Sequence, residues 1–267
     1  MTPLNSFLLY PTILIHGIGG DTSDLVDLST NLKNRGVDVY NMEIGNGKLD
    51  SIFWNMNKQC QVLGENIHNL SLQSEKINLI GVSQGGLLAR CYVEKYGHYI
   101  KPVHSLITYG TPHMGIYSSF LELKRLNYWK NPFKYQEYLD NNDFLSYINN
   151  DRNHTDMKLY KNNILSLDNF LVVWTDLEKV VDPPKSTRFE FYNISMAENF
   201  GNLEIVDFLE SDIYFEDKIG LKELYDKGKM MVKQYNCLHE EFKHPKCFLK
   251  NFTSQPYCLL DFTISLL

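Results

Sequence analysis

A serine flanked by glycines is the feature of this sequence that most directly suggests chemistry. The stretch "LIGVSQGG" places Gly81, Ser83 and Gly85 in the pattern G-x-S-x-G, which is typical of a nucleophilic serine on a sharp turn between a strand and a helix. The flanking residues must be small because the strand and helix backbones pass close together there. The pattern predicts that Ser83 attacks a carbonyl carbon, and a tight turn without catalysis is the alternative that the motif alone leaves open.

A serine hydroxyl is a weak nucleophile near neutral pH, so it needs a general base, usually a histidine oriented by a carboxylate. In the order typical of α/β hydrolases, the acid and then the histidine follow the serine. His239, in "CLHEEF", follows the last predicted strand and is the candidate base. We interpret His244 as a surface residue, and His154 falls inside a candidate insertion. The spacing H-E-E-F-K-H does not fit a zinc-binding helix face, so no metal site is predicted.

Two aspartates follow the predicted strand "FLVVW" and are candidates for the orienting acid. Both lie in "TDLEKVVDPP", as Asp176 and Asp182. We favour Asp182 because the prolines after it predict an ordered turn, which suits a residue of fixed orientation. Asp176 is interpreted as a strand-end or surface residue.

The oxyanion of a tetrahedral intermediate needs two N–H donors. One is predicted to be the backbone of Gln84, and the other the backbone of Ile18 in the glycine-rich loop "HGIGGD". His16, in the same loop, is interpreted as a packing or hydrogen-bonding residue rather than a base.

These residues require a sheet that brings several strand ends together. Short apolar runs rich in β-branched residues predict buried strands in five segments: 12–20, 37–45, 77–82, 103–115 and 170–174, and a sixth is predicted at 228–235. Apolar residues at helical spacing predict helices over 51–70 and after Ser83. Strands separated by helices indicate an α/β fold with a mostly parallel sheet flanked by helices. The aromatic-rich stretch 116–168 is predicted to be a helical insertion, or lid, over the active site, with an apolar groove that reaches Ser83.

The bulk composition excludes several functional classes. The chain has 267 residues and a formal net charge of −6, which fits a single α/β domain over 1–267 and predicts no nucleic-acid partner. No apolar segment approaches the roughly 20 residues of a membrane span. The first residues lack the pattern of a signal peptide, so we expect either a cytosolic protein or a mature form whose leader has been removed. Three of the five cysteines lie near the C-terminus and could form one disulfide or remain reduced.

The chain resembles the palmitoyl-protein thioesterases, lysosomal α/β hydrolases that remove fatty acyl groups from cysteine. The similar stretches run in order from residue 13 to about 242: "ILIHGIGGD", "VYNMEIG", "FWNMNKQ", "LIGVSQGG", "VVDPP", "IGLKELYDKGKMMV" and "CLHEEF". The segment "IGLKELYDKGK" is the most specific of these, because the general mechanics of a hydrolase do not require it.

The resemblance implies an α/β-hydrolase fold with Ser83 as nucleophile, Asp182 as orienting acid and His239 as base. It also implies oxyanion donors at Ile18 and Gln84. The implied activity is hydrolysis of the thioester between palmitate and cysteine in S-acylated proteins or peptides, and of acyl-CoA, with no cofactor. It places the protein in the lysosome or outside the cell, as a glycoprotein with N-x-S/T sites at Asn69, Asn153, Asn193 and Asn251. We expect a monomer.

Other functions remain open at this point. "ITYGTPHMG" is closer to the equivalent strand of lipases, so a lipase or carboxylesterase acting on acyl oxyesters is one alternative. A cytosolic-type acyl-protein thioesterase also carries an S-Q-G-G turn. Outside the enzyme class, the alternative is an inactive hydrolase fold that binds lipid or protein.

Overall fold

The computed structural model describes residues 9–118, 126–244, 247–249 and 258–267. Its centre is a seven-stranded sheet in the order β2-β1-β3-β4-β5-β8-β9, in which only β9 runs antiparallel to its neighbour. The strands are β1 (Thr12–Ile15), β2 (Val39–Met42), β3 (Ile77–Val82), β4 (Val103–Tyr109), β5 (Asn169–Trp174), β8 (Met230–Asn236) and β9 (Phe248–Leu249). Each predicted strand is therefore confirmed.

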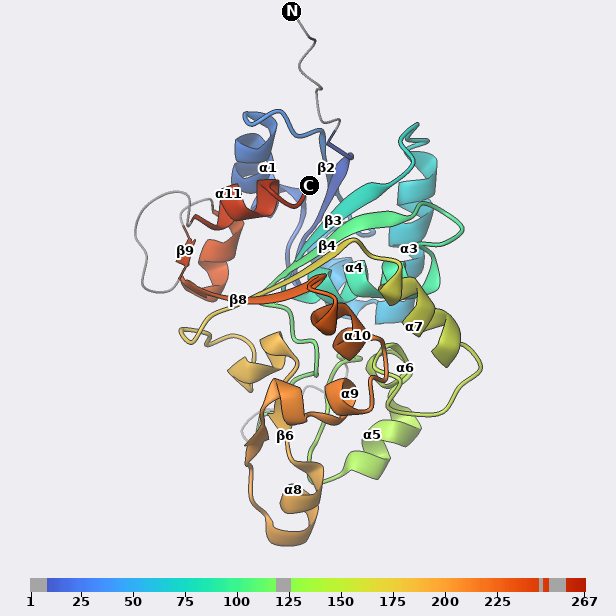
Figure 1. The fold of residues 1–267 in the computed structure, drawn as a ribbon, viewed down its shortest axis with the longest axis vertical. Coiled ribbons are helices and arrows are strands. Elements are labelled where there is room, and N and C mark those ends of the chain that lie inside the picture. Colours follow the sequence, from blue (N-terminus) through green and yellow to red (C-terminus); the bar gives the residue numbers. More distant parts are fainter. Residues whose placement is uncertain (1–8, 119–125, 245–246, 250–257) are drawn as a thin grey trace, which may run out of the picture.

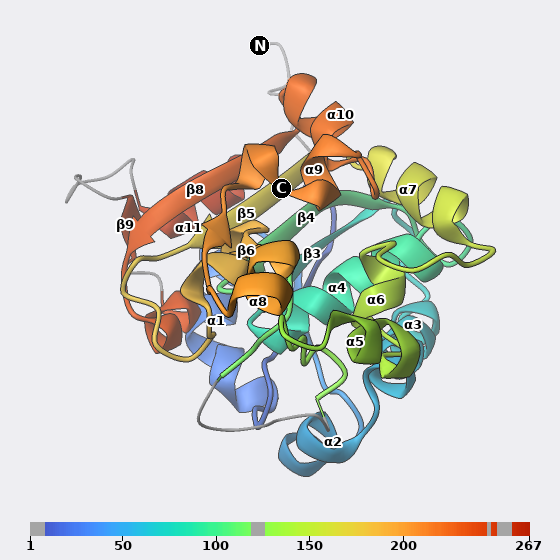
Figure 2. The same cartoon turned by 90° about the horizontal axis from the view of Figure 1, so that it is seen from below.

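Side chains from both faces of the sheet enter hydrophobic cores, which is why strands β1, β3 and β5 are mostly apolar. In β3, Ile77 and Leu79 belong to one core, whereas Ile80 and Val82 belong to the other. One face is covered by α3, α4 and α7, and the opposite face by α1 and α11 (Figure 2). These helices are α1 (Val26–Lys33), α3 (Met56–Asn69), α4 (Gln84–Lys95), α7 (Met157–Leu165) and α11 (Leu259–Ile264).

The predicted helix over 51–70 is two helices, α2 (Lys48–Phe53) and α3. The break falls at Trp54, whose backbone is extended, and Asn55 then caps α3 by accepting a hydrogen bond from the Asn57 N–H at 2.7 Å. An asparagine satisfies the free N–H groups of a helix start in this way. The cap at Asn55 therefore sets the boundary between α2 and α3, which helical periodicity alone could not predict.

Two excursions of the chain form a layer beyond the carboxyl ends of the parallel strands (Figure 1). The first lies between β4 and β5 and contains α5 (Tyr135–Asn141) and α6 (Leu145–Ile148) in this layer; α7 then leads back along the face of the sheet, packed against α4. The second lies between β5 and β8. It contains η2 (Pro184–Arg188), β6 (Phe191–Tyr192), α8 (Ile194–Phe200), β7 (Ile205–Val206), η3 (Phe208–Glu210), α9 (Asp212–Phe215) and α10 (Leu221–Asp226). Only the first was expected from the sequence, and its residues 119–125 lie outside the described part of the chain.

The sheet order brings the loops that follow β1, β3 and β4 next to one another. In the sheet, β1 lies between β2 and β3. The connection after β1 leads to β2 on one side, whereas the connection after β3 leads to β4 on the other side, so the two connections diverge between β1 and β3. Ligands of such sheets bind at the carboxyl ends of the strands where the connections diverge. Ile15 at the end of β1 is in register with Gly81 in β3, and Val82 is in register with Tyr109 in β4. Among the described residues, no helix is long and apolar enough to cross a membrane.

Candidate active site

Ser83 occupies a strained backbone position directly after β3. Its φ of 55° and ψ of −126° are unusual for a residue with a side chain, and such strain is concentrated at functional sites. The Ser83 N–H donates to the Tyr109 carbonyl at 2.8 Å, and α4 begins at the next residue. A Cβ on Gly85 would lie 2.3 Å from the Ile15 carbonyl oxygen, so this position accepts only glycine. The predicted strand, sharp turn and helix are confirmed.

His239 begins the short helix η4 (His239–Lys243), which follows β8. Its side chain is buried, with 5% exposed, and its Nδ1 lies 2.7 Å from Oε2 of Glu178. A Cβ placed on Gly110, the residue after β4, would lie 3.1 Å from this Nδ1. Tyr109, the last residue of β4, accepts a hydrogen bond from the Ser83 N–H, and Gly110 follows it. Ser83 and His239 therefore both lie at the carboxyl end of β4.

Glu178 comes from the loop after β5, and its side chain is fully buried. Its Oε1 accepts hydrogen bonds from the N–H groups of Val180 at 2.8 Å and Val181 at 3.0 Å. Burial raises the pKa of Glu178, but the hydrogen bond and charge of His239 and the two backbone donors outweigh burial, and the net pKa is lowered. Glu178 is therefore a fixed, ionised carboxylate at the imidazole.

The hydrogen bond predicted between Asp182 and His239 is not present, and this assignment is corrected. Asp182 is exposed, and its backbone carbonyl accepts from the Tyr117 N–H at 2.7 Å. Asp176, the other candidate, is also exposed. The physical reason is the fold of the loop: the two valine N–H groups bind the Glu178 carboxylate and turn it inward, which leaves both aspartates at the surface.

Sequence reasoning passed over Glu178 because only aspartates were weighed. The signal was available, since glutamate serves as the third member of such triads in α/β hydrolases, and Glu178 lies between the two aspartates that were considered.

The remaining candidate histidines have other partners. His244 is half exposed and pairs with Asp27, with 2.9 Å between Nδ1 and Oδ2. His154 contacts Asn150 and the Tyr147 carbonyl. His16 is buried, and its Nε2 lies 3.1 Å from Oε1 of Glu43. The interpretation of His16 as a packing and hydrogen-bonding residue is therefore confirmed.

The loop after β1 lies directly against the serine. A Cβ on Gly17 would be 3.1 Å from the Cβ of Ser83. Within the described part of the chain, neither the Ile18 N–H nor the Gln84 N–H has a hydrogen-bond acceptor. Gln84 is the first residue of α4, whose N-terminus carries partial positive charge. Both N–H groups are therefore available to an anionic oxygen.

Ser51, in α2, contacts both of these backbone segments. Its Oγ accepts from the Gly19 N–H at 2.9 Å, and its backbone carbonyl accepts from Nε2 of Gln84 at 2.9 Å. The Gln84 side chain also accepts from the Tyr128 hydroxyl at 3.0 Å. Sequence reasoning missed Ser51, and nothing in the motif indicates it, since its role arises only from tertiary contacts.

These groups can perform acyl transfer. A serine on a strained turn lies at the same sheet edge as a buried histidine–carboxylate pair, beside two free N–H donors. Among the described residues, no cluster of three or more histidine, cysteine or acidic side chains could hold a metal ion.

The sequence matches a protein family and several named relatives. The family model described as palmitoyl protein thioesterase matches residues 11–239. Palmitoyl-protein thioesterase 3 from Dictyostelium discoideum is 29% identical over 91% of this chain and 90% of its own length. Palmitoyl-protein thioesterase 1 from Caenorhabditis elegans is 25% identical over 82% of this chain and 83% of its own length. The lysosomal thioesterase PPT2 homolog from Drosophila melanogaster is 24% identical over 83% of this chain and 82% of its own length.

A solved structure of a monoacylglycerol lipase from Paleococcus ferrophilus is 16% identical, with a TM-score of 0.49 over 89% of this chain and 90% of that one. The family model covers most of the chain, including the elbow, the loop after β5 and His239. The chain is a hydrolase with an α/β-hydrolase fold, and it belongs to the palmitoyl protein thioesterase family.

Proposed function

We propose that this protein hydrolyses the thioester between a long-chain fatty acyl group, such as palmitate, and a cysteine of S-acylated proteins or peptides. Ser83 is the nucleophile, His239 the general base and Glu178 the orienting acid. The observation that carries the proposal is the buried hydrogen bond between His239 and Glu178, 2.7 Å long, beside the strand end that also holds Ser83. The family membership supports the acyl thioester as substrate class.

The mechanism follows from these positions. Oγ of Ser83 attacks the thioester carbonyl carbon, and its proton passes to Nε2 of His239. The negative oxygen of the tetrahedral intermediate accepts hydrogen bonds from the Ile18 and Gln84 backbones. Collapse of the intermediate breaks the carbon–sulfur bond and releases the cysteine sulfur, which takes the proton back from His239.

Deacylation reverses the roles. A water molecule gives its proton to His239 and attacks the acyl-serine carbonyl carbon, the fatty acid leaves, and Ser83 regains its proton. Glu178 remains ionised and stabilises the imidazolium that forms in each half-reaction. A thiolate is a good leaving group, so the same residues suffice for acyl-CoA. No step needs a cofactor.

The acyl chain needs an apolar site, and we propose that residues 116–168 supply it as a groove and lid over Ser83. Each buried methylene contributes about 0.8 kcal/mol, so kcat/KM should rise with acyl length until the groove is filled. A series of acyl-CoA substrates from short to long chains tests this, and an equal kcat/KM across the series would contradict the groove.

The cellular compartment of the protein is proposed on separate grounds. We infer a lysosomal or secreted protein, since named relatives are lysosomal thioesterases. Two disulfides, Cys60–Cys91 and Cys237–Cys247, suit an oxidising compartment. Of the predicted N-x-S/T sites, Asn69 and Asn153 are exposed, and Asn251 lies outside the described residues. A cytoplasmic form is the alternative, and treatment with an N-glycosidase distinguishes the two by a loss of mass.

Matched substrates test the reaction itself. A peptide carrying S-palmitoyl-cysteine and its O-palmitoyl-serine counterpart differ only at the scissile bond. We expect the thioester to have the higher kcat/KM, with Ser83→Ala inactive on both. A preference for the oxyester would favour a lipase or carboxylesterase, to which the stretch "ITYGTPHMG" is similar. Size-exclusion chromatography with light scattering checks the proposed monomer.

A further inference from the structure

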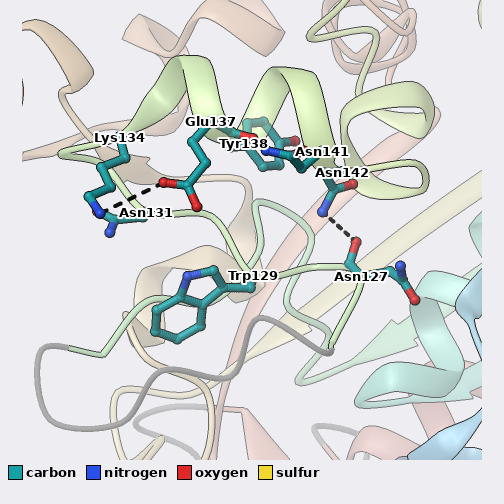
Figure 3. Close-up of a pocket in the computed structure, with 8 residues that line it drawn as sticks. All are labelled: Asn127, Trp129, Asn131, Lys134, Glu137, Tyr138, Asn141 and Asn142. Carbon is teal, nitrogen blue, oxygen red and sulfur yellow. Dashed lines mark hydrogen bonds and ion pairs between the residues drawn. The ribbon is translucent and has the colours of Figure 1, made fainter.

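A cavity of about 90 Å³ lies in the layer beyond the strand ends, between the segment 127–131 and α5 (Figure 3). Its walls combine amide, charged and aromatic side chains: Asn127, Trp129, Asn131, Lys134, Glu137, Tyr138, Asn141 and Asn142. These residues lie within the segment 116–168 proposed above as groove and lid, but none of them belongs to the triad or to the oxyanion donors. A water molecule needs roughly 10–15 Å³ of such space, so the cavity has room for a group of several non-hydrogen atoms.

Trp129 gives the strongest indication that a ligand belongs there. The residue is 7% exposed, and its indole Nε1 is buried without a hydrogen-bond partner in the described structure. Figure 3 shows the indole nitrogen on the ring edge that faces Asn131 and Glu137 across the cavity. A buried N–H without an acceptor costs free energy, and a ligand oxygen in the cavity would remove that cost.

The other polar groups of the wall both donate and accept. Oδ1 of Asn131 accepts from the Phe133 N–H at 2.9 Å, which leaves its Nδ2 as a donor. Nδ2 of Asn141 donates to the Glu137 carbonyl at 3.0 Å, which leaves its Oδ1 as an acceptor. Lys134 and Glu137 form an ion pair at 3.8 Å, so their charges offset each other.

The donors and acceptors that line the cavity determine which functional group can bind there. An acyl chain would leave the Trp129 N–H unpaired, an ammonium group could not accept its proton, and a carboxylate has no proton to donate to Oδ1 of Asn141. A hydroxyl group both donates and accepts, and it is neutral. The rings of Trp129 and Tyr138 offer apolar edges to the C–H groups between hydroxyls. We propose that the cavity is a subsite for one sugar ring, which presents its hydroxyl-bearing edge to these groups.

The three tryptophans of the chain, Trp54, Trp129 and Trp174, make a direct test possible. The indole N–H resonances of ¹⁵N-labelled protein are recorded by NMR and assigned with Trp54→Phe and Trp174→Phe, which leave the cavity intact. The experiment uses Ser83→Ala protein, so its outcome does not depend on the proposed hydrolysis. Methyl glucoside, N-acetylglucosamine, glycerol, N-methylacetamide and acetate are titrated separately.

We expect the Trp129 resonance to shift saturably with at least one of the two sugars, while those of Trp54 and Trp174 do not move. Asn141→Ala, which keeps the indole in place, should weaken sugar binding about fivefold, the change expected for one lost hydrogen bond. A matched change at an exposed residue of the same helix, Gln136→Ala, should leave it unchanged. The proposal is overturned if no sugar gives a saturable shift, or if N-methylacetamide, acetate or glycerol binds as well as the sugars.

Discussion

At the scale of single residues, the site depends on which carboxylate holds the imidazole. Replacing Glu178 by glutamine keeps the shape but favours the wrong histidine tautomer, which costs about 10⁴-fold in kcat in the serine-protease example of this change. We therefore expect Glu178→Gln to lose three to four orders of magnitude in kcat, by roughly that precedent, with a near-normal melting temperature. Steady-state hydrolysis of palmitoyl-CoA and a thermal melt measure both quantities.

Asp182→Asn is the matched control, because Asp182 lies four residues further along the same loop and is exposed. Surface substitutions have small effects, so its kcat should fall less than about tenfold. The opposite ranking of the two variants would return the orienting role to Asp182.

Ser51 belongs to the same scale, as a positioning residue for the oxyanion donors. Its hydroxyl binds the Gly19 N–H and thereby holds the loop that carries Ile18. Loss of an oxyanion donor costs roughly 10²–10³ in kcat, and loosening one should cost less, about tenfold. Ser51→Ala should thus lower kcat with little change in KM. Ser29→Ala, a buried serine in α1, should change neither; an effect of Ser51→Ala on melting temperature alone would contradict the positioning role.

Some of the site residues could be predicted from the sequence, and one could not. Ser83 and its turn could be predicted because a local backbone requirement fixes the glycines around it. His239 could be placed because it follows the last strand. Glu178 could have been named as a candidate, but the sequence could not rank it above Asp176 and Asp182, because the valine N–H groups that turn it inward act only once the loop is folded.

At the scale of elements, the disulfide Cys237–Cys247 closes a loop of 10 residues that contains His239. Cross-linking a loop of this length stabilises a protein by about 3 kcal/mol. The double variant Cys237→Ser, Cys247→Ser should therefore be less stable, and it should also lose kcat because η4 is no longer tied to β8. Urea unfolding and steady-state kinetics under conditions where the variant stays folded measure the two effects.

The second disulfide is the control for this prediction. Cys60–Cys91 joins α3 to α4 and closes no loop around His239. Removing it should lower stability by a similar amount, about 3–4 kcal/mol, while kcat in the folded protein stays close to that of the wild type. Equal losses of kcat in both double variants would contradict a specific role of Cys237–Cys247 in holding His239.

Element types were largely predictable, because buried strands and amphipathic helices leave clear patterns. The connection between β5 and β8 was not, since its elements are short. For example, β6 and β7 have two residues each and, within the described part of the chain, pair only with one another. Such elements depend on tertiary packing, and no periodicity can develop over so few residues.

At the scale of the whole molecule, a buried pair in α4 links stability to pH. Arg90 and Glu94 are both fully buried, with 3.5 Å between Nε and Oε1. Burial raises the pKa of Glu94 to about 8, against the opposing charge of Arg90. Neither carboxyl oxygen has a hydrogen-bond partner among the described residues. The folded state therefore holds this proton at a pH where the unfolded chain has lost it.

The sign of the effect follows from that difference. The folded pKa lies above the unfolded value of about 4.3, so the stabilisation is complete below that value and is lost as pH rises toward 8. The slope reaches at most about 1.4 kcal/mol per pH unit. Glu178, with its lowered pKa, stays ionised over this window. Below about pH 6.5 the buried His113, whose pKa is lowered by burial, contributes the opposite slope. We therefore expect the free energy of unfolding to fall from about pH 6.5 to pH 8 and Glu94→Gln to flatten that dependence; an unchanged slope would contradict the assignment.

The central claim is that Ser83 carries the acyl group between cysteine and water. Intact-protein mass spectrometry of rapidly quenched mixtures with an S-palmitoyl peptide, followed by peptide mapping, tests it most directly. In the wild-type protein we expect one palmitoyl group on the peptide that contains Ser83, and in Ser83→Ala we expect none. Glu178→Gln should accumulate more of this acyl-enzyme if deacylation slows more than acylation. Thiol release by Ser83→Ala at the wild-type rate, or a palmitoyl group attached elsewhere in the active wild-type protein, would contradict it.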